Sequence, residues 1–161
     1  RAMLSEKSER IIAVEDVTEL ASKDIIGLQS RSSNVEGQGE IGLEQLVRES
    51  LRMRPDRIVV GEVRGSELIA MLQALNTGHR GATTIHANGL AQVPERLSTI
   101  KADLAISDHS FSKMVAAAFD WVISLEAKSG QRRVSGIGKF ELKENQLVVR
   151  EHLPRQKLAL A

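Results

Sequence analysis

Two short runs of β-branched residues, each bounded by charged residues, occupy positions 10–14 and 57–60 of the 161-residue chain. Short apolar runs without polar alternation are typical of strands buried on both faces, as in parallel sheets. Between the runs, apolar residues recur at helical spacing from Leu43 to Leu51, and charged residues occupy the opposite face. A strand, a helix and a second strand in this order predict an α/β protein with a doubly wound, mostly parallel sheet.

The alternation of strands and helices continues along the chain, and Gly78 suits the C-terminus of one of the helices. The further expected elements are helices over 68–75, 94–100 and 107–118, strands over 82–85 and 121–125, and an antiparallel hairpin of 133–142 and 146–150. We expect the strand at 121–125 to complete the parallel sheet and the hairpin to be added at its edge. This organisation predicts one domain over residues 1–152 and a poorly ordered tail over 153–161.

Composition excludes several functional classes. Lys and Arg number 22 against 21 for Asp and Glu, so no strong field attracts nucleic acid or an acidic membrane. The chain has no cysteine, which excludes thiolate chemistry and disulfides. No apolar run approaches the ~18 to 20 residues that span a bilayer, and the N-terminus lacks a signal-peptide pattern. We therefore expect a soluble, cytoplasmic protein.

Chemistry-bearing residues follow three of the expected strands. Glu15 and Asp16 follow the first, Glu62 follows the second, and His86 follows the third. Ligands of doubly wound sheets bind at the carboxyl ends of the strands. A carboxylate there can hold a Mg²⁺-bound water or orient an attacking water, and an imidazole can reach a terminal phosphate. Each group alone also has an ordinary structural interpretation, as a helix cap or a structural histidine.

Three motifs, in this order, resemble those of the type II and type IV secretion and pilus-assembly traffic ATPases. Residues 12–16 resemble the aspartate box, 51–65 the Walker B region and 77–88 the histidine box. The Arg-Gly pair at the end of the second motif and residues 34–41 are most similar to the tight-adherence pilus and type IV secretion branch. The resemblance extends to about Trp121 and implies a RecA-like P-loop NTPase fold, with ATP and Mg²⁺ as cofactors.

The resemblance also implies roles for individual residues. Glu15 resembles the carboxylate that polarises the attacking water, and Asp16 is its neighbour in the box. Glu62 stands at the Walker B position that acts on Mg²⁺ and water, while Gly61 replaces the aspartate of the commoner version. His86 resembles the histidine that approaches the γ-phosphate.

Three further residues match recurrent family positions with less defined roles. Arg52 and Arg64 could reach phosphate or form inter-subunit pairs through a planar guanidinium, but arginines also commonly form surface ion pairs. His79 could contact nucleotide, yet its place directly after the helix end at Thr77 and Gly78 favours a cation at the helix C-terminus.

A phosphate-binding Gly-x-x-x-x-Gly-Lys-Ser/Thr loop does not occur in the sequence. Residues 1–4 resemble the continuation of the helix that begins at such a loop. We therefore expect the chain to be the C-terminal ATPase domain of a longer protein, in which this loop and an N-terminal domain precede it.

Three functional hypotheses follow. The first is the motor domain of a homo-hexameric ATPase that works with inner-membrane components of a secretion or pilus system, at the cytoplasmic face and without sequence-specific nucleic-acid binding. The second is a non-catalytic oligomerisation or scaffold module of the same fold. The third, a metal hydrolase that uses His79, His86, Glu15 and Asp16, is weaker because these residues lack the spacing of ligands on one helix.

Overall fold

The computed structural model describes residues 9–35, 37–102, 104–128 and 130–153. The chain divides into two compact units, residues 1–85 and 86–161. The helix end expected at residues 1–4 lies outside the described residues, as do residues 154–161 of the tail expected over 153–161. The first residue of that tail, Leu153, is instead the last residue of a strand.

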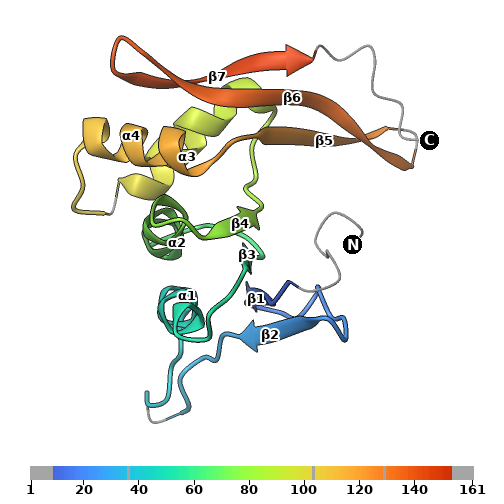
Figure 1. Ribbon diagram of the computed structural model, residues 1–161, viewed down its shortest axis with the longest axis vertical. Coiled ribbons are helices and arrows are strands. Elements are labelled where there is room, and N and C mark those ends of the chain that lie inside the picture. The colour runs from blue at the N-terminus through green and yellow to red at the C-terminus, as the bar shows by residue number, and fades with distance from the viewer. Residues whose placement is uncertain (1–8, 36, 103, 129, 154–161) are drawn as a thin grey trace. The chain divides into compact units, whose positions relative to one another are not determined.

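The first unit is built on a parallel four-stranded sheet (Figure 1). Its strands are β1 (Ile11–Glu15), β2 (Ile25–Gln29), β3 (Arg57–Val60) and β4 (Arg80–Thr83), in the order β2-β1-β3-β4. All five residues of β1 are buried, as are the last three of β3. These burial patterns confirm that the two β-branched runs form interior strands.

Helices α1 (Leu43–Leu51) and α2 (Glu67–Asn76) connect β2 to β3 and β3 to β4, and they pack against each other beside the sheet (Figure 1). Gly81 on β4 allows α2 to approach closely, since an added Cβ would lie 2.9 Å from Leu75 Cδ2 and 2.6 Å from the Ile58 carbonyl oxygen. Gly78, with a φ of 102°, follows the C-terminus of α2 as expected.

Two details of this sheet differ from expectation. β2 was not expected, because its five-residue run contains Gly27 and its side chains are exposed or only half-buried. β4 begins at Arg80, two residues before the expected strand at 82–85. Both strands lie at the edges of the sheet, where partial exposure weakens the hydrophobic pattern on which the prediction relied.

The second unit contains two α-helices that pack against a three-stranded antiparallel sheet, in which the strand order is β5-β6-β7. Its elements are the 3-10 helix η1 (Leu90–Gln92), α3 (Val93–Lys101), α4 (Asp108–Ala118), β5 (Val122–Lys128), β6 (Gln131–Lys143) and β7 (Gln146–Leu153). Ser107 caps α4 by accepting the N–H of Ser110. The turn between β6 and β7 has positive φ at Glu144 and Asn145, which confirms the hairpin.

The prediction that residues 121–125 complete the parallel sheet is wrong. β5 pairs antiparallel with β6, and the hairpin forms a separate sheet with β5 instead of extending the edge of the parallel one. The prediction took the apolar run as a strand that is buried on both faces, as in a parallel sheet. In the structure the apolar side chains of Ile123 and Leu125 are exposed.

Candidate functional site

The order in which strands are added to the parallel sheet reverses at β1, since β2 lies on one side of β1 and β3 on the other. In open α/β sheets, ligands bind at such a switch point, outside the carboxyl ends of the strands. Glu15 is the last residue of β1, and Glu62 lies two residues beyond the end of β3. The switch point therefore coincides with the sequence motifs. We call Glu15, Asp16, Glu62 and Arg64 the strand-end cluster.

Gly61 allows the two strand ends to pack together. Val14 pairs with Val60 across β1 and β3, and the Gly61 N–H donates to the Val14 carbonyl at 2.9 Å. A Cβ at Gly61 would lie 3.2 Å from Glu15 Cγ, which is closer than an ordinary carbon contact. The glycine in place of the commoner aspartate thus makes room for the Glu15 side chain.

Glu15 is 5% exposed, and the backbone of the loop that follows it holds its carboxylate. Its Oε1 accepts the N–H groups of Glu19 and Leu20, both at 3.2 Å. Two backbone donors stabilise the ionised carboxylate and compensate for its burial. The same bonds fix the chain directly after β1 against the strand end.

Asp16 is exposed and ties the end of β1 to the end of β2. Its Oδ1 accepts the Ser30 hydroxyl at 2.8 Å, and its carbonyl accepts the Gln29 amide at 3.1 Å. The carboxylate of Asp16 in the strand-end cluster is therefore oriented by the residue that directly follows β2.

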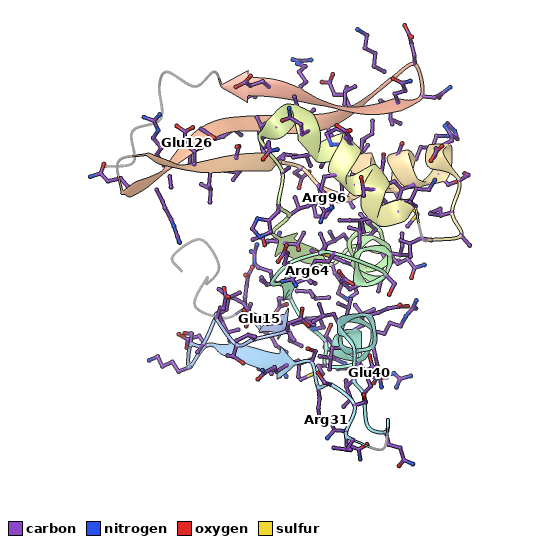
Figure 2. All side chains as sticks on the ribbon, turned by 180° about the vertical axis from the view of Figure 1, so that it is seen from behind. Glu15, Arg31, Glu40, Arg64, Arg96 and Glu126 are labelled. Carbon is purple, nitrogen blue, oxygen red and sulfur yellow. The ribbon has the colours of Figure 1, made fainter. Side chains whose placement is uncertain are left out.

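Glu62 and Arg64 form an ion pair. One carboxylate oxygen, Glu62 Oε2, accepts Arg64 Nε at 2.9 Å and lies 2.7 Å from Arg64 Nη2. The Glu62 side chain is 18% exposed and that of Arg64 is 62% exposed. The hydrogen bond with Glu62, followed by its negative charge and by those of Asp16 and Glu67, raises the pKa of Arg64. Figure 2 shows Glu15 on β1 and Arg64 on the segment between β3 and α2.

The segment after β4 is tied to the segment that carries Glu62. The Val63 N–H donates to the Thr84 carbonyl at 3.1 Å, and the Thr84 hydroxyl donates to the Gly61 carbonyl at 2.6 Å. His86 follows two residues later, is exposed, and is the first residue of the second unit.

His79 and Arg52 precede β4 and β3, at the amino ends of the strands, whereas the strand-end cluster lies at the carboxyl ends. His79 directly precedes β4, and its Nδ1 is 3.2 Å from the Ala74 carbonyl oxygen at the end of α2. Arg52 follows α1 and pairs with Glu49 at 3.0 Å, with 79% of its side chain exposed. The structure therefore does not bring His79 together with Glu15, as the metal-hydrolase hypothesis requires.

Glu62 suits a Mg²⁺ ion that is shared with phosphate. Among the described residues, no group of three or more His, Asp or Glu side chains could hold a metal ion by itself. Mg²⁺ at phosphate sites, however, usually takes only one or two carboxylates and completes its shell with water and phosphate oxygens. Glu62 is partly exposed at a strand end and fits this pattern, whereas the buried Glu15 is occupied by backbone donors.

Sequence reasoning missed Glu67, whose buried carboxylate accepts the N–H groups of Arg64 and Gly65. The available signal was an acidic residue in the first turn of an expected helix, directly after the Walker B-like motif. That signal ordinarily indicates only a favourable interaction with the helix dipole.

The sequence profile of the type II/IV secretion system protein family matches residues 2–132. A Mycobacterium tuberculosis H37Rv protein, provisionally named as a conjugal transfer protein, is 43% identical over 143 residues, which are 86% of this chain and 41% of the relative. The chain thus spans about two fifths of the length of such relatives.

Solved structures of secretion and pilus proteins share the fold. The VirB11 ATPase of the Brucella suis type IV secretion system, in complex with sulphate, matches with a TM-score of 0.69 at 23% identity, over 81% of this chain and 40% of that one. The pilus retraction motor PilT with bound ADP matches with a TM-score of 0.57 at 23% identity, over 97% and 42%. These likenesses confirm the expected RecA-like α/β fold.

Proposed function

Because the chain belongs to the family of type II/IV secretion system proteins, we propose that it is the ATP-hydrolysing motor domain of a secretion or pilus-assembly ATPase. The observation that carries this proposal is the strand-end cluster, which gathers Glu15, Glu62 and Arg64 at the switch point of a parallel sheet. Conversion of ATP to ADP and phosphate there would power protein export or pilus assembly.

Each residue of the proposed site has a distinct task. Glu62 would hold a water of the Mg²⁺ shell, and the ion would supply positive charge that neutralises the phosphates. Glu15 would orient and polarise the attacking water through the acceptor position that its backbone donors leave open. Arg64 pairs with Glu62, and its exposed guanidinium can turn to phosphate. His86, which follows the segment hydrogen-bonded to Gly61 and Val63, approaches the γ-phosphate.

The wider assembly is part of the same proposal. The C-terminal ATPase domain extends to the end of β7 at Leu153, and the complete protein is a homo-hexamer. It works at the cytoplasmic face of the membrane with inner-membrane components of the secretion or pilus system. The similar structures support this assignment, since their names give a type IV secretion system ATPase and a pilus retraction motor. No helix in the described ranges is long and apolar enough to cross a membrane.

Replacement of Glu62 by glutamine in the complete protein tests the proposal. The amide keeps the shape of the side chain but cannot act as a carboxylate towards Mg²⁺ or water. We expect Glu62→Gln to abolish ATP turnover and to leave ATP affinity within about threefold of wild type, because the loss falls on the chemical step. Turnover by phosphate release and affinity by titration are the two measurements.

Glu95→Gln is the matched control, because it makes the same chemical change at an exposed position in the first turn of α3. Near-normal turnover of Glu62→Gln would refute the role of Glu62. A wild-type protein that assembles and binds its partners without hydrolysing ATP would instead support the scaffold hypothesis.

A further inference from the structure

The segment that carries Glu62 and Arg64 is held by a buried carboxylate. Glu67, the first residue of α2, is 7% exposed. Its Oε1 accepts the backbone N–H of Arg64 at 2.5 Å and that of Gly65 at 2.7 Å. Hydrogen bonds from backbone donors to an ionised carboxylate are stronger than those between neutral groups, so this contact holds the backbone firmly.

The start of α2 explains why a charged residue is buried at this position. Ser66, the residue before the helix, makes no capping hydrogen bond. Its side chain instead hydrogen-bonds to Glu44, which lowers the pKa of Glu44. The positive end of the α2 dipole and the two N–H donors compensate for the burial of Glu67. Removal of the Glu67 carboxylate would leave both donors without this partner.

The remaining backbone contacts fix the same segment from the other side. The N–H groups of Gly61 and Val63 donate to Val14 and Thr84, and Val63 is 1% exposed. Glu62 therefore lies between two anchored points, the buried Val63 contact and the end of β3. The third anchor, Glu67, acts on Arg64, whose side chain is the ion-pair partner of Glu62.

We infer that Glu67 is a positioning residue, which fixes the backbone of Arg64 and Gly65 and thereby sets the place of the Glu62 carboxylate and its arginine partner. The catalytic consequence rests on the proposed ATPase function. A displacement of a reacting group by about 1 Å can cost ~100-fold in rate. We therefore expect Glu67 to affect the rate of the chemical step, although its carboxylate accepts hydrogen bonds from the backbone of Arg64 and Gly65.

Two substitutions in the complete protein separate positioning from charge. Glu67→Ala removes the acceptor, and we expect kcat to fall by ~100-fold while KM for ATP stays within about threefold. Glu67→Gln keeps an oxygen that can accept both N–H groups, so it should retain kcat within about tenfold of wild type. Val47→Ala is the control, because it removes a fully buried side chain from α1 without altering the segment 61–65.

Hydrogen exchange at the amides of Arg64 and Gly65 gives a second readout that needs no activity. We expect faster exchange at these two amides in Glu67→Ala, and near-wild-type exchange there in Glu67→Gln and Val47→Ala. Unchanged exchange in Glu67→Ala would overturn the inference. So would equal losses of kcat in Glu67→Ala and Val47→Ala at equal melting temperature, since these would show a general effect of stability.

A third result would also overturn the inference. If Glu67→Gln were as inactive as Glu67→Ala but showed normal amide exchange, the charge of Glu67 would be required for activity, and not its hydrogen bonds to the backbone. A wild-type protein without ATPase activity would refute the proposed function. In that case the exchange experiment still decides whether Glu67 fixes the segment.

Discussion

The carboxylates of Glu15, Glu62 and Glu67 differ in the hydrogen-bond donors that contact them. Backbone N–H groups hold Glu15 and Glu67, whereas the guanidinium of Arg64 contacts Glu62. A backbone donor is fixed by the fold, but an exposed arginine side chain can move to another anion at little cost. The contact between Glu62 and Arg64 is therefore the one in this set that is most easily exchanged when a nucleotide arrives.

His86 provides a prediction at the same scale. We expect His86→Ala to slow ATP hydrolysis by the complete protein by ~100-fold, the order of a lost acid, base or phosphate contact. Because His86 is exposed, its removal should change the free energy of unfolding by only about 0.5 kcal/mol or less. Paired turnover and melting measurements check both parts.

The matched control is His109→Ala, which removes an exposed histidine from the start of α4. We expect it to change neither quantity appreciably. A loss of stability in His86→Ala that accounts for the whole loss of turnover would indicate a structural histidine.

Among the secondary-structure elements, the packing of α2 on β4 depends on the absence of a side chain. Gly81 lies under α2, where a Cβ would collide with the Ile58 carbonyl oxygen and Leu75 Cδ2. Gly27 on β2 is a strand glycine with no atom within 4 Å of an added Cβ. Both glycines lie in edge strands of one sheet, but only Gly81 is at a position where the packing leaves no space for a side chain.

We expect Gly81→Ala to lower the free energy of unfolding by about 1 to 3 kcal/mol, because the backbone of β3 cannot move aside for the new methyl group. Gly27→Ala should be neutral or stabilising by up to about 1 kcal/mol, since alanine restricts the unfolded chain more than glycine does. Denaturant unfolding of both variants measures the difference. Equal stability of the two would contradict the close packing at Gly81.

At the scale of the whole molecule, the 161 residues supply acidic groups for the proposed site but no phosphate loop. Affinity for a nucleoside triphosphate comes largely from backbone amides at a helix N-terminus and a lysine. Asp16, Glu15 and Glu62 would repel the phosphates unless Mg²⁺ lay between them. We therefore expect these 161 residues alone to bind ATP with a Kd of ~1 mM or weaker, about −4 kcal/mol, and to show no measurable hydrolysis.

Titration of a fluorescent ATP analogue into the 161-residue chain and into the complete protein measures this difference. Tight, Mg²⁺-dependent binding by the shorter chain would contradict the proposed position of the phosphates. Binding that appears only in the complete protein would support it.

Several parts of the fold were predictable because their signals are local. The interior strands β1 and β3 follow from uninterrupted β-branched runs, and the helix end at Gly78 follows from a single residue with a known backbone preference. The order of three motifs was sufficient to identify the family, since each motif lies in a short stretch of sequence.

Tertiary structure alone decided which distant segments pair. The residues of β5 do not by themselves show whether this strand pairs parallel with β4 or antiparallel with β6. Its partner, β6, is known only from the tertiary structure. The same holds for the strand-end cluster: the motifs placed Glu15 and Glu62 on strand ends, but the fit of Glu15 beside Gly61 and the anchoring by Glu67 depend on how the backbone packs there. A short motif specifies which groups are available, whereas the contacts that position them come from residues brought together by folding.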